Sequence, residues 1–280
     1  KSYSYWRIIL GLWLQNFVDV VFQRDTLIRR ALNEFPVSGA DGIEINYPVL
    51  VADCTQDYLS QLVSQEWNSA LFSEILSFRG VTVSSLEIPL TNSNATGRKK
   101  NQFPERSFFE KLYGTASQKS ILAFADPYLG RAEQIELALR TKSLPLRVNR
   151  TPLRSNDYDV QWRSKFVIQQ PSHFSIETLI KNLLPFHLPR SVVEHYGRMT
   201  DSRTWFGYPN KPKSIFTANA HLSSDHFASW AAQKVEDGAT LLISQHGGLY
   251  GESELRTRHE VHEISVANRF LTWGWDDKTH

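Results

Sequence analysis

Short apolar runs alternate with amphipathic stretches along this chain, and the alternation is clearest in its last quarter. Residues 214–221 and 240–244 begin as apolar runs that predict buried strands, and residues 269–275 predict a third strand. Helical patterns lie between these strands, one opening at residues 223–225 and the other around His262. Strands that alternate with helices predict βαβ units, so this region indicates an α/β fold with a parallel sheet.

The first two thirds of the chain are richer in helical patterns. Residues 5–32 are predicted to form one long helix or two, and apolar positions recur at near-helical spacing over residues 53–77. Residues 120–125 form a short, continuous apolar run that is typical of a buried parallel strand. The prolines Pro185 and Pro189 are expected to stop the amphipathic helix that precedes them. The same reasoning predicts helices at 131–140, 175–184 and 191–199 and a strand at 144–148.

The length of 280 residues favours two domains, because most single domains are shorter. We place the boundary near residue 160, which gives one domain of residues 1–160 and another of residues 161–280. The sequence begins at Lys1 and its only methionine is Met199, so we expect the natural protein to begin earlier. A predicted strand close to the last residue leads to the same expectation for the other end, and both domains are then incomplete.

Charge and sequence motifs argue against several classes of protein. A net charge of +2 gives no indication of nucleic-acid binding, and the basic run at residues 98–100 is interpreted as a solvated loop. The single cysteine, Cys54, excludes an internal disulfide and a cysteine-based zinc site. The sequence contains no Gly-x-Ser-x-Gly elbow, Walker loop or Gly-x-Gly-x-x-Gly loop, which argues against serine hydrolases, P-loop nucleotidases and Rossmann-type dehydrogenases.

Residues 5–22 form the most apolar stretch, and its length approaches that of a membrane span. Arg7, Gln15, Asn16 and Asp19 interrupt it, and an Asp near the centre of a bilayer costs about 2.5–3.5 kcal/mol. We therefore expect a helix that is largely buried or lies at an interface.

Polar residues and glycines gather where the predicted strands of the last quarter end. Residues 245–251, Gln-His-Gly-Gly-Leu-Tyr-Gly, follow one strand, and Asn219 and His221 follow the strand before it. Ligands of open α/β sheets bind outside the carboxyl ends of the strands. Glycines there let backbone N–H groups approach an anion, and His246 can contact a phosphate or move a proton. The helix near His262 would point its positive end at the same crevice.

The histidines of this region do not predict a metal site. His259 and His262 are three residues apart with Glu263 adjacent, but the His-Glu-x-x-His pattern of a zinc site is absent from the sequence. Glu263 instead suits a helix cap or an acceptor of hydrogen bonds from ribose or sugar hydroxyls. Ser223 or Ser224 is expected to cap the helix that opens there.

Five stretches together resemble, in their order and spacing, the transferases encoded in bacterial O-antigen biosynthesis regions. They are Trp-Arg-Ile-Ile-Leu-Gly-Leu-Trp-Leu at 6–14, Ala-Asn-Ala-His at 218–221, Gln-His-Gly-Gly-Leu-Tyr-Gly at 245–251, His-Glu at 262–263 and Phe-Leu-Thr-Trp-Gly-Trp at 270–275. The first differs from the family's Gly-Pro-Trp by having Gly11-Leu-Trp13. That family is similar to GT-B-type glycosyltransferases, including bacterial transferases that use CMP-activated Kdo.

The resemblance implies two Rossmann-like domains facing a cleft. The acceptor side would be the domain of residues 1–160, and the nucleotide-sugar side the domain of residues 161–280. The implied activity is that of a glycosyltransferase, which moves a sugar from a nucleotide-activated donor resembling CMP-Kdo to a surface polysaccharide such as the O-antigen of lipopolysaccharide.

Specific residues are expected to carry this activity. His246, His221 and Asp126 are the candidate catalytic residues, and Asp41 and Glu44 are alternatives for the base or nucleophile. The candidate donor-binding residues are Asn219, Gln245, Gly247, Gly248, Tyr250, Gly251, His262 and Glu263. No metal or other cofactor is expected, because hydrogen-bond donors of the protein can stabilise the departing phosphate.

Two other functions stay open at this point. A nucleotide-sugar epimerase on the same kind of fold would turn over the donor without an acceptor. A non-catalytic glycan-binding protein would bind sugar without a nucleotide, and its binding would survive the substitution His246→Ala. The concentration of histidines and glycines at strand ends favours the transferase. Its expected partners are a nucleotide-sugar and a glycan acceptor, and its expected location is the cytoplasm, either free or at the cytoplasmic face of the inner membrane.

Overall fold

A computed structural model describes residues 1–43, 45–86, 107–150, 154–167, 175–252 and 256–276. These residues form two compact units, each assembled from separate stretches of chain. Unit 1 contains Lys1–Leu12, Gln102–Pro152 and Gly197–His280, and unit 2 contains Trp13–Asn101 and Leu153–Tyr196. The domain boundary near residue 160 stays a prediction, and each unit draws on residues from both sides of it.

Unit 1 is built on a four-stranded sheet in which chain order and spatial order agree. The strands lie in the order β3 (Leu122–Ala125), β4 (Ser214–Thr217), β5 (Thr240–Ser244) and β6 (Arg269–Leu271). Neighbouring strands pair in parallel, with Phe124 opposite Phe216 and Phe216 opposite Leu242. All four strands therefore end at the same edge of the sheet. The α/β class and the parallel sheet predicted for the last quarter are confirmed.

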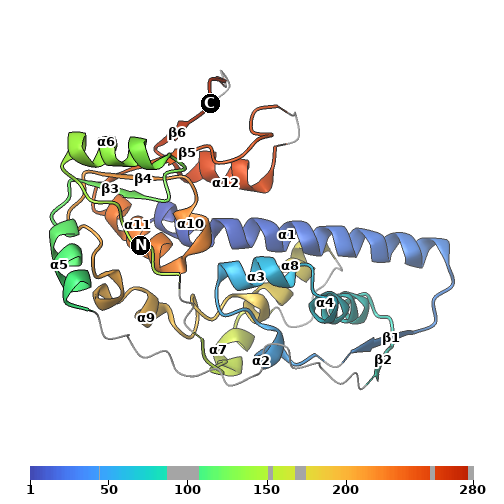
Figure 1. The fold of residues 1–280 in the computed structure, drawn as a ribbon. Helices are drawn as coiled ribbons and strands as arrows, with labels where there is room; N and C mark the ends of the chain where they lie inside the picture. Colours follow the sequence, from blue (N-terminus) through green and yellow to red (C-terminus); the bar gives the residue numbers. More distant parts are fainter. Residues whose placement is uncertain (44, 87–106, 151–153, 168–174, 253–255, 277–280) are drawn as a thin grey trace. The chain divides into compact units, whose positions relative to one another are not determined.

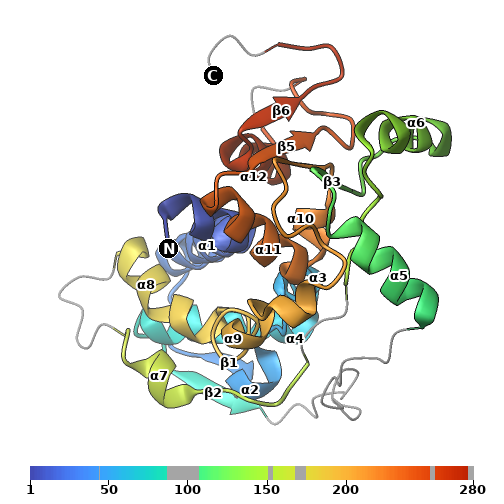
Figure 2. The same ribbon diagram turned by 90° about the vertical axis from the view of Figure 1, so that its left-hand side faces the viewer.

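The helices of unit 1 begin where the sequence supplies a cap. The Ser224 hydroxyl accepts a hydrogen bond of 3.1 Å from the backbone N–H of Phe227, which confirms the predicted cap of α11. Figure 1 shows β3 and β4 between α6 and α11, and Figure 2 shows α12 beside β5 and β6. The elements of this unit outside the sheet are α5 (Phe108–Ser117), α6 (Arg131–Thr141), η1 (Ser202–Trp205), α10 (Ala220–Ser223), α11 (Asp225–Glu236) and α12 (Arg258–Val266). The short helix α9 (Tyr196–Met199) begins at the last residue of unit 2 and continues into unit 1.

The core of unit 1 lies between the sheet and α11. Ile215 and Leu241 of the two inner strands are completely buried, as are Phe227 and Ala231 of the helix. The indole N–H of Trp230 donates to the carbonyl oxygen of Pro209 at 3.3 Å, so the largest side chain of this core has its polar atom satisfied.

Unit 2 is mostly helical and has an aromatic core. Trp13 stacks on Phe17 with ring centroids 5.0 Å apart, and Tyr58 and Trp67 meet edge to face at 5.6 Å. His187 lies 5.8 Å from Trp67, and its Nε2 is 2.9 Å from the buried carboxylate of Glu74. The elements of this unit are most of α1 (Tyr3–Glu34), the parallel pair β1 (Ala40–Ile43) and β2 (Val83–Leu86), α2 (Tyr47–Leu50), α3 (Thr55–Gln61), α4 (Gln65–Phe78), α7 (Val160–Ser164) and α8 (Ile176–His187).

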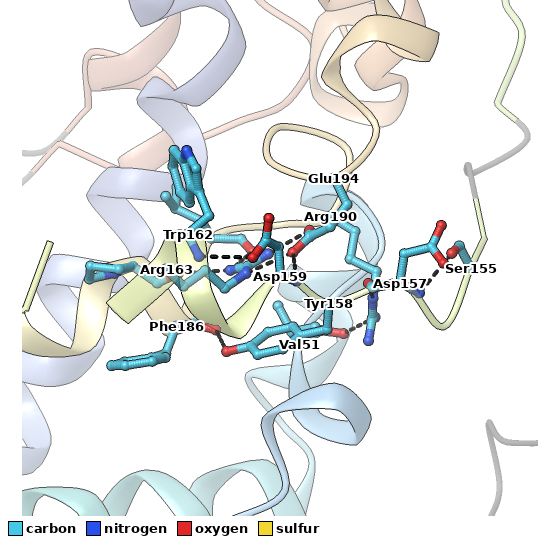
Figure 3. A network of polar contacts seen from close by, with 12 residues as sticks. Val51, Ser155, Asp157, Tyr158, Asp159, Trp162, Arg163, Phe186, Arg190 and Glu194 are labelled. Atoms are coloured by element: carbon cyan, nitrogen blue, oxygen red, sulfur yellow. Dashed lines mark hydrogen bonds and ion pairs between the residues drawn. The ribbon is translucent and has the colours of Figure 1, made fainter. Parts of the chain in front are cut away.

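Two buried arginines tie distant stretches of unit 2 together (Figure 3). The guanidinium of Arg163 donates to both carboxylate oxygens of Glu194, at 2.9 and 2.7 Å, and its side chain is fully buried. The guanidinium of Arg190 donates to Asp53 at 3.0 Å and to the carbonyl oxygen of Val51 at 2.7 Å. Removing one partner of a buried pair costs about 3–5 kcal/mol, so the fold of unit 2 depends on these contacts.

Several predicted elements differ from the structure. The helix predicted at 53–77 is two helices, α3 and α4, and Ser64 caps the second by accepting from the Trp67 N–H at 3.3 Å. The prediction that Pro185 stops its helix was wrong, because α8 continues to His187. The predicted strand at 144–148 is reduced to one bridge between Phe124 and Pro145. The helix predicted at 191–199 is the single turn α9.

The apolar stretch near the start of the chain lies within α1, where Tyr5, Ile8 and Leu12 are buried. Across the described residues, no helix combines the length and the apolar character that a bilayer crossing requires. The prediction of a largely buried helix is confirmed. The basic run at residues 98–100 lies outside the described residues.

Candidate functional site

The sheet of unit 1 brings candidate residues from distant parts of the sequence to one edge. Asp126 follows β3, Asn219 and His221 follow β4, and His246 follows β5. Because the strands are parallel and adjacent, these loops lie at the carboxyl ends of the strands, where open α/β sheets hold their ligands.

A cluster of histidines surrounds the buried carboxyl group of Glu263, which α12 provides. His246 Nδ1 is 3.3 Å from Glu263 Oε1, and His221 Nε2 is 3.9 Å from the same oxygen. The ring of His262 stacks on that of His221 at 6.0 Å, and the Tyr250 hydroxyl is 3.4 Å from His246 Nδ1. The structure thus places two predicted catalytic residues, His221 and His246, and two predicted donor-binding residues, Tyr250 and His262, around Glu263.

Burial shifts the ionisation of this cluster towards neutral forms. It raises the pKa of Glu263 to about 8, and a hydrogen bond from Tyr250 acts in the opposite direction. Burial first, and neighbouring imidazoles second, lower the pKa of His221 well below its ordinary value. Burial also lowers the pKa of His262 to about 4 and lowers the pKa of His246. At neutral pH the cluster therefore consists of neutral imidazoles and a largely protonated carboxyl group.

His221 is held in the cluster at a cost in stability. Both of its ring nitrogens are buried and lack a hydrogen-bond partner among the described residues. A buried polar group without a partner costs about 1–3 kcal/mol, and such groups concentrate at functional sites. The shifted pKa values of the same cluster support the same interpretation.

Gln245 anchors the loop that carries His246. Its side-chain amide donates to the carbonyl oxygen of Gly247 at 2.8 Å. Its carbonyl oxygen accepts from the Trp273 backbone N–H at 3.1 Å and from the indole N–H of Trp275 at 2.8 Å. Gln245 is only 4% exposed, so within the protein its role is to orient this loop, and a direct contact with a donor stays a prediction.

The glycines of the same loop have different environments. Gly248 has open space where a side chain would stand, whereas a Cβ at Gly251 would lie 2.6 Å from the Trp275 ring. Gly251 also has a φ of 70°, which disfavours other residues. Tyr250 is buried and stacks on Phe270 at 6.1 Å. Tyr250 thus packs on the buried side of the loop, Gly251 makes room for the Trp275 ring, and Gly248 is exposed.

The remaining catalytic candidates come from other parts of the chain. Asp126 pairs with Arg150 at the end of β3, and Asp41 lies in β1 of unit 2. Glu44 lies outside the described residues. None of these placements tests a catalytic role, so Asp126 stays the candidate base or nucleophile.

Two exposed aromatic residues at this edge escaped sequence reasoning. Tyr128 and Trp273 are 61% and 59% exposed, and their rings stack at 6.4 Å. Tyr128 also meets His246 edge to face at 6.3 Å. Tyr128 follows the strand predicted at 120–125, which was a usable signal, whereas Trp273 was placed inside the strand predicted at 269–275 and follows a strand only because β6 ends at Leu271. Aromatic residues are also more often core than surface. Arg150 gave no signal, because its pairing with Asp126 depends on the fold.

Within the described parts of the chain, no group of three or more His, Cys, Asp or Glu residues has an arrangement that could hold a metal ion.

Comparison with known families supplies the general activity. A family model described as LIC12162 family transferase matches residues 1–280. No curated protein and no solved structure matches the chain. The chain therefore belongs to the LIC12162 family of transferases, and this membership confirms the transferase part of the prediction.

Proposed function

We propose that this transferase is a glycosyltransferase, which moves a sugar from a nucleotide-activated donor to a glycan acceptor. The observation that carries the proposal is the cluster of neutral imidazoles around Glu263 at the carboxyl ends of parallel strands. A transferase that uses a nucleotide-sugar must stabilise a departing phosphate, and preorganised donors achieve this most effectively. A relation to GT-B enzymes and to transferases that use CMP-Kdo is part of the same proposal.

His246 is the proposed contact to the donor phosphate. In this scheme Nδ1 of His246 faces the protonated Glu263 carboxyl at 3.3 Å and the Tyr250 hydroxyl at 3.4 Å, so Nδ1 is the acceptor and the proton of the neutral imidazole lies on Nε2. The Nε2–H group then donates to an oxygen of the phosphate, whose negative charge grows as the sugar leaves. Glu263 acts through His246 in this scheme and is a positioning residue.

The exchange of bonds is simple. The bond between the anomeric carbon and the phosphate oxygen breaks, with its electron pair remaining on the phosphate. The acceptor oxygen forms the new bond to that carbon and loses its proton to the carboxylate of Asp126 if the reaction inverts. If the reaction retains configuration, the same carboxylate first attacks the anomeric carbon as the phosphate leaves; the acceptor oxygen then attacks that carbon, Asp126 leaves as a free carboxylate, and the acceptor's proton passes to the released phosphate.

The acceptor and the location complete the proposal. We propose a surface polysaccharide such as O-antigen as the acceptor, and the cytoplasmic face of the inner membrane as the place of reaction. Protein hydrogen-bond donors supply the charge stabilisation in this scheme, so it requires neither a metal nor another cofactor. Nucleic acid has no role in it, in keeping with a net charge of +2.

A thermal-shift screen tests the donor site. CMP, CDP, UDP, GDP and dTDP are each added to the wild-type protein and to His246→Ala. At a hundred times its dissociation constant, a nucleotide stabilises the native state by about 2.7 kcal/mol, which is a shift of several degrees. We expect one nucleotide to raise the melting temperature of the wild type and to have little effect on the variant.

The unliganded melting temperature of His246→Ala is the control for an intact fold. An absence of any shift in the well-folded wild type would overturn the nucleotide site. An equal shift in both proteins would support a nucleotide site but would show that His246 does not contribute to nucleotide binding.

A further inference from the structure

The turn after β3 has an unusual backbone. Asp126 and Tyr128 adopt positive φ angles of 42° and 56°, although neither is a glycine. Such conformations are strained and persist only where the surrounding structure fixes them, often at ligand sites. In this turn the strain accompanies a Tyr128 side chain that is 61% exposed.

A cavity of about 380 Å³ opens beside this turn. This volume is at the small end of the range of about 300–1,000 Å³ for ligand pockets, and it suits a single ring. The polar side chains among its lining residues are Asp126, Gln134, Arg150 and Asn219, and Tyr128 and Leu146 contribute apolar surface.

The charges of the cavity cancel. Arg150 forms an ion pair with Asp126, and the two side chains are 52% and 28% exposed. An anion would meet the carboxylate and a cation would meet the guanidinium, so neither is favoured. A neutral ligand with many hydroxyl groups can instead donate to Asp126 and accept from Arg150. The side chain of Asn219 does not cap α10, which leaves its amide available to the same ligand.

Tyr128 joins this cavity to the histidine cluster. Its ring lines the cavity and also meets the His246 ring at 6.3 Å. The ring face of an aromatic side chain packs well against the C–H groups of a sugar. A sugar bound here would therefore lie next to the proposed donor phosphate, with a hydroxyl group near Asp126.

From these features we infer that the cavity binds one neutral, pyranose-sized sugar and is the subsite of the acceptor. The acceptor role rests on the proposed glycosyl transfer, whereas sugar binding by itself does not. The inference places both partners of the reaction in unit 1, at neighbouring strand ends of one sheet.

Saturation-transfer NMR tests the subsite in the absence of any nucleotide. The probes are the methyl glycosides of glucose, galactose, mannose and N-acetylglucosamine. Tyr128→Asn removes the ring with a residue that tolerates positive φ. Tyr3→Asn is the matched control, because Tyr3 is 77% exposed on the first turn of α1. We expect at least one glycoside to bind, with about tenfold weaker binding in Tyr128→Asn and unchanged binding in Tyr3→Asn.

A second variant, Asn219→Ala, provides an independent test if Tyr128→Asn does not fold. It is expected to weaken the binding of the same glycoside. The subsite is overturned if no glycoside binds, or if a glycoside binds Tyr128→Asn and Asn219→Ala as tightly as it binds the wild type. Either result overturns it even if a nucleotide binds. If a glycoside binds but no nucleotide raises the melting temperature, the sugar site is supported and the proposed donor site is overturned.

Discussion

The carboxyl group of Glu263 lies fully buried between two imidazoles, and this arrangement makes the stability of the protein depend on pH. An unfolded glutamic acid has an ordinary pKa near 4.5, whereas burial raises the pKa of folded Glu263 to about 8. Between these values the folded state keeps a proton that the unfolded state releases. The free energy of unfolding therefore falls as the pH rises, by about 1.4 kcal/mol per pH unit for one proton.

Glu263→Gln should flatten this dependence. Glutamine has nearly the same shape and cannot ionise, so the contribution of the carboxyl group disappears between pH 6.5 and 8. Histidines with lowered pKa values change the free energy of unfolding mainly below pH 6.5, where only the unfolded state takes up protons. They therefore contribute little to the slope between pH 6.5 and 8. Urea unfolding at a series of pH values measures the slope. Parallel slopes for wild type and Glu263→Gln would show that the folded carboxyl group is already ionised at neutral pH.

The packing of α1 against α12 explains a glycine inside a long helix. Glycine is normally unfavourable there by about 0.5–1 kcal/mol relative to alanine. A Cβ at Gly11 would lie 2.9 Å from Nδ1 of His262, which is buried and stacks on His221. The lack of a side chain at Gly11 therefore allows the first turns of α1 to pack closely against the ring of His262.

Gly11→Ala should lower stability although it improves the helix propensity. Overpacking in a core costs about 1–3 kcal/mol, which exceeds the gain from propensity. Gly197→Ala in α9 is the matched control, because nothing lies within 4 Å of its added Cβ, and it should be neutral or stabilising. The double variant Gly11→Ala/His262→Ala should show a favourable coupling in urea unfolding. Additive effects would mean that the two side chains do not compete for space.

Elements with strong local signals were predictable from the sequence. The strand at 240–244 was predicted to the residue, and Ser224 caps α11 as expected from its place before an amphipathic run. The extension of α8 through Pro185 was not predictable. A proline removes one backbone donor and normally breaks a helix, but Leu179 and Leu183 bury the face that holds α8 in place. Tertiary packing decided this case.

The composition of the site was partly predictable and its geometry was not. Strand ends indicated where His221 and His246 would lie, because the position of a loop follows from that of its strand. The burial of Glu263 between them depends on α12 packing against β5, a contact without a local signal. For the same reason, nothing in the sequence connects Arg150 with Asp126.

At the scale of the whole molecule, each unit is assembled from segments that the sequence separates. The sheet of unit 1 needs β3, which comes before residue 150, as well as β4, β5 and β6, which follow residue 210. Its outer strand β3 pairs with β4 from Leu122 to Ala125, and the first turns of α1 pack on His262. A cut between residues 160 and 161 separates these partners.

A protein made of residues 161–280 alone should therefore fail to fold cooperatively. It would expose the edge of β4 and the buried face of His262, and a sheet edge without its neighbour promotes aggregation. Thermal unfolding followed by near-ultraviolet circular dichroism is the measurement, with the 280-residue chain as the control. A sharp transition in the short protein would show that the predicted domain of residues 161–280 is autonomous after all.

The same interleaving sets an order of events during translation. All segments of unit 2 have been synthesised by Tyr196, when unit 1 still lacks β4, β5 and β6. Chains emerge from the ribosome at about 5–20 residues per second, so several seconds separate the two stages. On the ribosome, the helical unit is complete first, and the residues that surround Glu263 meet only when the last strands have emerged.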